Sequence, residues 1–279
     1  MQSRIDLLYW QRLAILVGLL VAGLVVLLFV EPFQQDLNYH ELADSRLFLG
    51  IPNFNDVVSN AGFALVGVLG LVAVAGVRRH TLFVKPVDAR PYLIFFAGVA
   101  LVSLGSAWYH WAPDNERLLW DRLPMSVAFM AFAAAIIADR IHARAGNTWL
   151  LVVLIILGLL SLLYWQYTEQ HGRGDLRFYA FVQFYPVILL PVVLWLFPDY
   201  RYVPSRYIAW VFAWYGLSKV LEHFDARVFE LLGYTISGHT LKHLAAAISA
   251  FVVLRMLSSR LPLHQRPRSI QSERGGSVT

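Results

Sequence analysis

The chain has 279 residues, of which 58% are apolar and 15% are charged, whereas soluble domains usually carry about 25% charged residues. It contains no cysteine, which excludes disulfide frameworks and thiolate metal sites, so a metal would need His, Asp, Glu, Ser or backbone oxygen ligands. The net charge of +5 does not indicate nucleic acid, because it is divided unequally between the two sides of a membrane.

Apolar runs long enough to cross a bilayer recur along almost the whole sequence. A spanning helix needs about 20 mostly apolar residues, and the period-2 alternation of strands is absent. The first run is long for a secretory signal and lacks a small-residue cleavage pattern after it, so we interpret it as a retained helix. We predict an all-α membrane protein with about eight spans, at residues 10–30, 56–77, 91–110, 118–138, 148–167, 178–197, 206–223 and 239–257.

Eight spans place both termini on the same side of the membrane. That side carries 15 basic and 5 acidic residues, and the opposite side carries 8 basic and 13 acidic residues. Because basic loops are retained in the cytoplasm, we expect both termini there, in the inner membrane of a bacterium. Residues 1–258 are expected to form one transmembrane domain, and the basic segment 259–279, with its Ser and Gly, a disordered cytoplasmic tail.

Polar residues that a bilayer tolerates poorly gather at the outer ends of four spans. They come from the starts of the second, fourth and eighth spans and from the end of the third. They are Asp56, Ser59, Asn60, Ser106, His110, Asp121, Arg122, His239, Lys242 and His243.

The spacing of the histidines suits a metal ion. His239 and His243 are four residues apart, so they share one helix face and can share a cation at about 2.0–2.1 Å. His110 could add a third nitrogen, and three protein ligands with one open position are typical of catalytic zinc. Ser106 lies one turn before His110, and a short turn brings Asp121 back beside the third span. These residues predict a metal site near the outer leaflet.

Each of these residues also has a structural interpretation. The histidines of the eighth span could be a hydrogen-bonded packing pair or part of a haem site. His110 could extend its side chain to the interface, and Asp121 could form an ion pair with Arg122. Ser106 could simply allow close helix packing.

Other polar residues are expected to be structural. Ser59 and Asn60 are interpreted as packing residues of the second span. Lys219, Glu222 and Asp225 are expected to form an interfacial network of ion pairs near the end of the seventh span. The histidines of loops and tail are expected to be solvated: His40, His80, His142, His171 and His264.

Four motifs follow one another between residues 53 and 257: Ser59-Asn60, Ser106-x-x-x-His110, Asp121 eleven residues later, and His239-x-x-x-His243. In this order they resemble the alkaline ceramidase family, a branch of the CREST superfamily of seven-helix membrane hydrolases that includes the progestin and adipoQ receptors. The resemblance implies a seven-helix ceramidase-like bundle over residues 53–257, preceded here by one additional N-terminal helix. It implies that the three histidines of these motifs bind zinc, with Ser106 and Asp121 beside the catalytic water.

Calcium is a second cation that the resemblance raises. Ceramidases of eukaryotes bind calcium through an acidic segment just before the first core helix. The corresponding stretch here offers Glu41, Asp44, Asn53 and Asp56, but their spacing does not transfer residue by residue. The resemblance therefore raises calcium binding by this segment, but it assigns no ligand to any of these residues.

The resulting hypothesis is a zinc-dependent hydrolase that cleaves the amide bond of ceramide, or of a related lipid amide, to fatty acid and sphingoid base. Asp121 would accept the proton of water, and Ser106 would help to steady the oxyanion. The expected partners are a membrane lipid and the bilayer, with no nucleic acid and no obligatory protein partner. The alternatives are a receptor-like zinc protein that senses a lipid, a haem protein, and a transporter or proton relay. Almost purely apolar cytoplasmic halves of the spans count against a relay.

Overall fold

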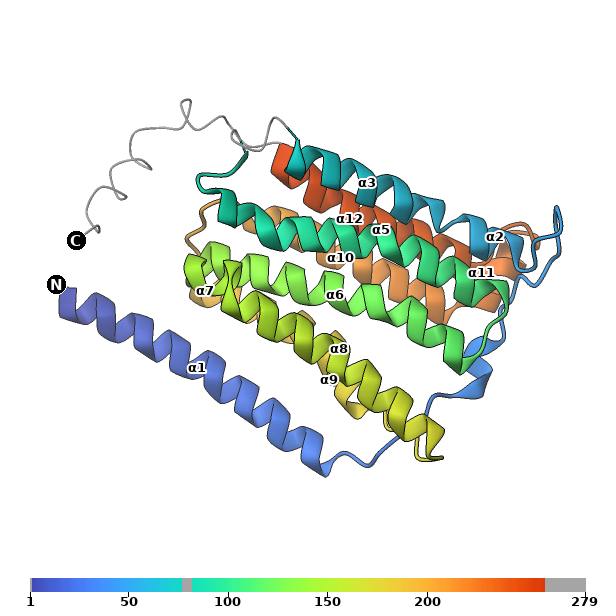
Figure 1. Ribbon diagram of the computed structural model, residues 1–279, viewed down its shortest axis with the longest axis horizontal. Helices are drawn as coiled ribbons and strands as arrows, with labels where there is room; N and C mark the ends of the chain where they lie inside the picture. The colour runs from blue at the N-terminus through green and yellow to red at the C-terminus, as the bar shows by residue number, and fades with distance from the viewer. Residues whose placement is uncertain (1, 77–81, 259–279) are drawn as a thin grey trace.

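The computed structural model describes residues 2–76 and 82–258, with side chains from residue 7 onward. The predicted disordered tail at 259–279 lies outside the described residues. Within the described part, the chain is built from helices without a strand, and the long helices run side by side in one bundle (Figure 1). This confirms the all-α class predicted from the sequence.

The long helices alternate with short ones at the ends of the bundle. The short elements are η1 (Leu37–His40), α2 (Phe54–Val58), η2 (Pro86–Ala89), α7 (Ala143–Asn147) and α11 (Asp225–Leu231). The long ones are α1 (Gln2–Phe29), α3 (Ala61–Ala75), α5 (Arg90–Trp111), α6 (Asn115–Arg140), α8 (Trp149–Gln170), α9 (Arg177–Leu196), α10 (Ser205–His223) and α12 (Gly238–Ser258).

Seven stretches of the described chain are long and apolar enough to cross a membrane, and each coincides with a predicted span. One of them combines α2 and α3, which a turn at Ser59 and Asn60 separates. The remaining predicted span is α10, which packs against α12. Every 18-residue stretch of α10 contains Arg206, Lys219 and Glu222, so α10 lacks a stretch of that length with at most two charged residues, which the other spans have. The protein is a multi-pass membrane protein.

The additional N-terminal span, α1, lies at the edge of the bundle against α9 (Figure 1). Almost none of its apolar stretch is buried by the rest of the chain. Such a helix can leave water only by facing lipid, because its own backbone hydrogen bonds are already satisfied. α1 is therefore peripheral to the bundle formed by the later helices.

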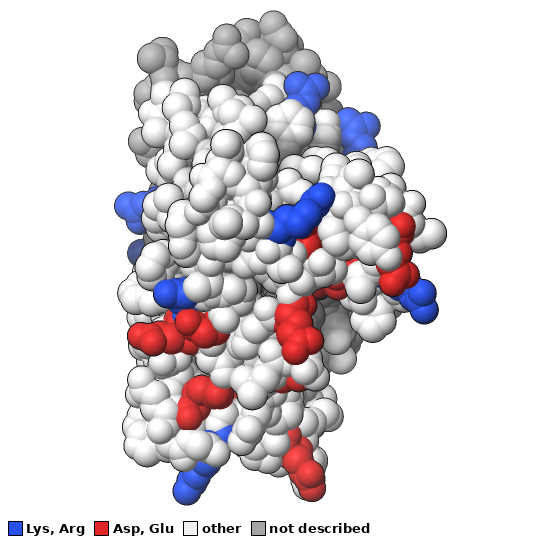
Figure 2. Space-filling model, turned by 90° about the vertical axis from the view of Figure 1, so that its right-hand side faces the viewer, with Lys and Arg blue, Asp and Glu red and all other residues white. Residues whose placement is uncertain are grey.

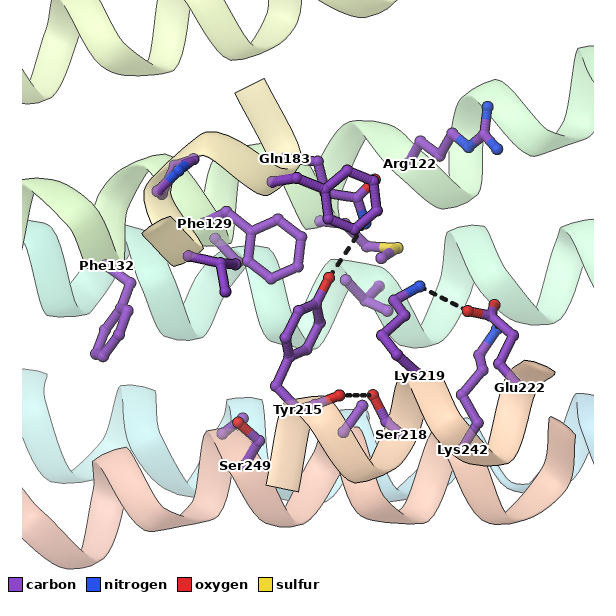
Figure 3. Close-up of a pocket in the computed structure, with 18 of the residues that line it drawn as sticks. Arg122, Phe129, Phe132, Gln183, Tyr215, Ser218, Lys219, Glu222, Lys242 and Ser249 are labelled. Atoms are coloured by element: carbon purple, nitrogen blue, oxygen red, sulfur yellow. Dashed lines mark hydrogen bonds and ion pairs between the residues drawn. The ribbon is translucent and has the colours of Figure 1, made fainter. Parts of the chain in front are cut away.

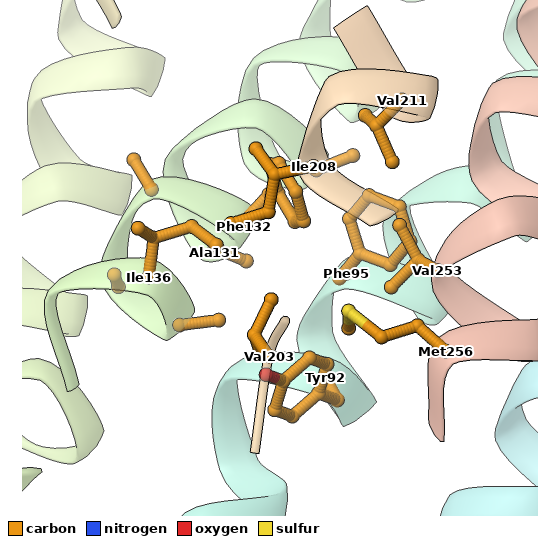
Figure 4. Close-up of a cluster of buried hydrophobic side chains, with 14 of the residues drawn as sticks. Tyr92, Phe95, Ala131, Phe132, Ile136, Val203, Ile208, Val211, Val253 and Met256 are labelled. Carbon is orange, nitrogen blue, oxygen red and sulfur yellow. The ribbon is translucent and has the colours of Figure 1, made fainter. Parts of the chain in front are cut away.

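Close packing of small residues holds α5 and α6 together. In lipid, helix association depends on van der Waals contact, which small residues improve by letting backbones approach. Alanines of α6 such as Ala131 are fully buried, and they pack with Phe95, Phe132 and Ile208 in the central core (Figure 4). At Gly105 of α5 a Cβ atom would overlap the carbonyl oxygen of Trp120, so this approach requires glycine.

The end of the bundle opposite the histidines is less apolar than predicted. Arg140 and Asp139 are buried there, and both bind the backbone of the segment between α9 and α10. Arg140 donates to the carbonyls of Pro198 (2.6 Å) and Val203 (2.5 Å). Asp139 accepts from the amide of Tyr202 at 2.6 Å. These charges are buried because they satisfy a connecting segment that has no helical hydrogen bonds of its own.

Candidate metal centre

The three predicted histidines meet at one end of the bundle. His110 lies in the last turn of α5, and His239 and His243 lie in the first two turns of α12. All three are buried, with 0%, 4% and 2% of their surface exposed, so an interfacial position for His110 is wrong. Their ring centroids are 4.7–5.0 Å apart. One nitrogen from each lies within 4.8 Å of the others, so the cluster could hold a metal ion.

Two of the nitrogen atoms are separated by the distance that a shared tetrahedral metal ion would require. Nε2 of His110 and Nε2 of His239 lie 3.3 Å apart. Two nitrogens at about 2.0–2.1 Å from one tetrahedral ion would be about 3.3–3.4 Å apart. Lys242 lies 2.9 Å from the same Nε2 of His239. An ammonium can only donate, so this nitrogen accepts a hydrogen bond from Lys242, and a bound metal would take the place of that hydrogen bond.

Ser59 fixes the third imidazole. Its hydroxyl donates to the carbonyl of Asp56 at 3.2 Å and lies 2.7 Å from Nδ1 of His243. A metal at Nε2 would require the tautomer that carries its proton on Nδ1, and in that tautomer the hydroxyl oxygen accepts from Nδ1–H while its own proton goes to the carbonyl of Asp56. That Nε2 is buried and has no hydrogen-bond partner in the described structure. The prediction that Ser59 only packs helices is incomplete, since it also orients a candidate ligand.

Two carboxylates hold the start of α12. Asp56 accepts hydrogen bonds from Ser237 at 3.2 Å and from Thr240 at 2.6 Å. Asp225 accepts from the backbone amide of His239 at 2.7 Å. Carboxylates at a helix N-terminus satisfy free amides and complement the helix dipole. The position of both histidines along α12 is thereby fixed from outside the helix.

Asp121 and Ser106 form a pair on facing helices. Both side chains are buried, and both contribute to the same cavity wall. The close approach of α5 and α6 at Gly105 brings them together. No ion pair joins Asp121 to Arg122 among the described residues, which argues against that structural interpretation.

A charged network lies beside the histidines, but its membership differs from the prediction. Glu222 binds Lys219 at 2.6 Å and Lys242 at 3.0 Å, and Tyr39 donates to it at 3.1 Å. Asp225 is not part of it, because its oxygens bind backbone amides instead. The third member of the network is Lys242 rather than Asp225, because Lys242 lies on the turn of α12 that faces α10.

These groups line one deep cavity between α5, α6, α9, α10 and α12 (Figure 3). Its volume is about 380 Å³ and most of its wall is apolar. Polar groups gather at one end, where Asp121, Ser106, His243 and the Glu222 network contribute to the lining. A hydrogen bond of 3.2 Å between Gln183 and Tyr215 connects α9 to α10 across the wall (Figure 3).

Asp44, in the loop segment before α2, binds neighbouring side chains. Among the described residues, the three histidines are the only group of three or more His, Asp or Glu side chains close enough to share an ion. Asp44 instead binds Arg46 at 2.6 Å and Asn55 at 2.8 Å. Burial would raise the pKa of Asp44, but these hydrogen bonds outweigh it and hold the pKa below its usual range. Asp44 therefore connects Arg46 and Asn55 and stabilises the loop before α2.

His40 is also more ordered in its contacts than predicted. Its two ring nitrogens lie 3.0 Å from the Tyr109 hydroxyl and 2.9 Å from Oδ1 of Asn115. It is half-buried, so the expectation of a solvated loop histidine is wrong.

Figure 2 looks onto the end of the molecule where α2 and α11 lie and shows acidic side chains spread over it.

Fold and site together define a multi-pass, all-α membrane protein with a buried three-histidine cluster that could hold a metal ion. Comparisons with protein-family models, with curated proteins and with solved structures gave no match to this chain. The resemblance to the alkaline ceramidases therefore rests on the four sequence motifs.

Proposed function

We propose that this protein is a zinc-dependent membrane amidase that hydrolyses ceramide or a related lipid amide to a fatty acid and an amine. One observation carries the proposal: a cluster of three histidines that could hold a metal ion reaches, through His243, an apolar cavity that Asp121 and Ser106 also line. An apolar cavity with a few convergent polar groups is typical of a ligand site. Its long apolar wall suits an acyl chain.

The residues present fit a zinc ion. His110, His239 and His243 would hold it, since each offers a buried nitrogen to a common point and one of these nitrogens has no other partner. Three neutral imidazoles leave a fourth position open, as in catalytic zinc sites. When bound, zinc would supply a Lewis acid that lowers the pKa of water toward about 7.

Asp121 is the proposed general base. Its carboxylate would take a proton from the attacking water while the water oxygen bonds to the acyl carbon. It would then return that proton to the amide nitrogen as the carbon–nitrogen bond breaks. Ser106 lines the cavity together with Asp121, and its proposed role is to help to steady the oxyanion.

The proposed location follows from the charge distribution of the loops. The end with the histidines would face the periplasm and the basic end the cytoplasm of a bacterium. A lipid could then reach the cavity from the outer leaflet without leaving the bilayer.

The test is release of fatty acid from a panel of ceramides and simple lipid amides by purified protein. We expect release by the zinc-loaded wild type and none by His243→Ala. His171→Ala is a matched control, because His171 is an exposed histidine that contacts only its own helix end. A folded, zinc-loaded protein that releases no fatty acid from any amide would refute the proposal and favour a lipid-sensing receptor.

A further inference from the structure

Arg122 is a buried arginine in a box of aromatic rings. It is 9% exposed, and its guanidinium carbon lies 4.9 Å from the ring centroids of both Trp165 and Tyr179 and 5.6 Å from that of Tyr39. Rings in this position attract a cation through their π faces. Their π faces carry no counter-charge, so the box holds the guanidinium without neutralising it.

The hydrogen bonding of Arg122 is incomplete. Nη2 donates to Oε1 of Gln35 at 2.6 Å, a neutral partner. Nη1 is buried and has no partner among the described residues. Arg122 forms no ion pair there either, whereas Lys219 and Lys242 share Glu222. A buried charge without a counter-charge is costly, and one with a free N–H group is more so.

Arg122, which has no counter-charge among the described residues, is part of the cavity wall. Arg122, Tyr39 and Tyr179 are all part of its lining, together with Asp121 on the same turn of α6. Three cations and two carboxylates line the cavity, namely Arg122, Lys219, Lys242, Asp121 and Glu222, so its charge is positive before any metal binds. A neutral lipid would leave this positive charge uncompensated.

We propose that Arg122 binds an anionic oxygen group, a phosphate or a carboxylate, on the amine-derived part of the lipid. The planar guanidinium suits both groups, because two of its N–H donors can bind two oxygens in parallel. This inference rests on the proposed amidase function and narrows its substrate class to anionic lipid amides. Ceramide itself would then be a poorer ligand than a lipid amide with a charged headgroup.

The test compares two lipids that differ only in one phosphate group. Ceramide and ceramide 1-phosphate with identical chains compete with a fluorescent lipid amide for purified protein. EDTA-treated protein is used, so that a phosphate cannot bind through a metal. We expect the phosphorylated lipid to bind at least ten times more tightly than ceramide. Arg122→Gln should bring the ratio close to one, and Arg122→Lys should give an intermediate ratio.

Arg117→Gln is the matched control. Arg117 lies on the same helix and also stacks on an aromatic ring, that of Trp108 at 4.8 Å, but it is not part of the cavity lining. This variant should keep the wild-type ratio. If Arg122→Gln fails to fold, the ratio of Arg122→Lys against that of Arg117→Gln decides the question.

Three results would overturn the inference. The first is equal binding of the two lipids by wild type, and the second is an unchanged ratio in Arg122→Gln. The third is displacement of the phosphorylated lipid by millimolar inorganic phosphate, which would identify a free anion as the ligand. Hydrolysis of ceramide without a preference for charge would refute this inference alone. A preference for charge without hydrolysis of any amide would refute the amidase alone.

Discussion

The hydroxyl of Ser59 lies 2.7 Å from Nδ1 of His243, and this contact orients an imidazole whose other nitrogen is buried without a partner. Loss of such a supporting hydrogen bond typically weakens metal affinity about 10- to 100-fold. We expect this loss in Ser59→Ala, measured by zinc titration of metal-free protein, while Ser59→Thr keeps most of the affinity. Ser161→Ala removes a buried hydroxyl from α8 and should bind zinc normally. Wild-type affinity in Ser59→Ala would show that the contact does not orient the ligand.

The histidine cluster predicts that zinc occupancy depends on each of three side chains. His110→Ala, His239→Ala and His243→Ala should each contain much less than the wild-type zinc, measured by elemental analysis of purified protein. The reason is that two nitrogens cannot complete a tetrahedral protein site with one open position. Full occupancy in any one of the variants would remove that histidine from the ligand set.

Asp121 can be separated from the ligands by its effect on activity. Asp121→Asn keeps the size of the side chain but cannot accept a proton, so amide hydrolysis should fall about 10²- to 10⁴-fold. Zinc content should stay the same, because the three histidines are unchanged. Glu116→Gln, at an exposed position of the same helix, should retain both properties. Loss of zinc from Asp121→Asn would make Asp121 a ligand or a structural residue instead.

The close approach of α5 and α6 predicts a steric effect at Gly105. A Cβ at this position would overlap the carbonyl oxygen of Trp120, and backbone cannot move as a flexible side chain can. Gly105→Ala should destabilise the protein by about 1–3 kcal/mol and lower its unfolding temperature. Gly216→Ala in α10 adds a methyl group where nothing lies within 4 Å, so it should leave the temperature unchanged or raise it. Equal temperatures for the two variants would contradict the packing argument.

The loop after α8 predicts a loss of stability in acid. Hydrogen bonds from Arg177 lower the pKa of Asp175 below its usual range. A lowered folded-state pKa stabilises the protein above the unfolded pKa of about 3.9, and this contribution disappears as the pH falls through the folded value. Wild type should therefore lose unfolding temperature below about pH 4 more steeply than Asp175→Asn. Glu31→Gln, at an exposed position, should follow the wild-type curve.

The sequence predicted the histidine cluster because two simple rules agree on it. An i,i+4 spacing fixes His239 and His243 on one face of α12, and alternating spans place His110 at the same end of the bundle. Neither rule depends on how the helices are rotated. The same reasoning located Asp121 and Ser106, which the turn after α5 brings together.

The roles of the neighbouring polar residues depend on helix rotation, which composition does not determine. Asp225 was expected to pair with a lysine, but it reaches the first amides of α12 because a helix begins opposite it. The partner of Lys242 is not indicated by the sequence. Its turn of α12 brings it to Glu222 of α10. His40 contacts Tyr109, and Ser59 contacts His243. Both partners are far away along the chain, and no motif in the sequence indicates these contacts.

The hydrogen bonds of Arg140 have a consequence for what can pass through the molecule. Its guanidinium donates to Phe197, Pro198, Val203 and Ser205, so this charge holds the connecting segment across the end of the bundle opposite the histidines. Opening that end would cost several charge-assisted hydrogen bonds at once. We therefore expect the water and both products of the proposed hydrolysis to enter and leave at the end of the bundle where the histidines lie.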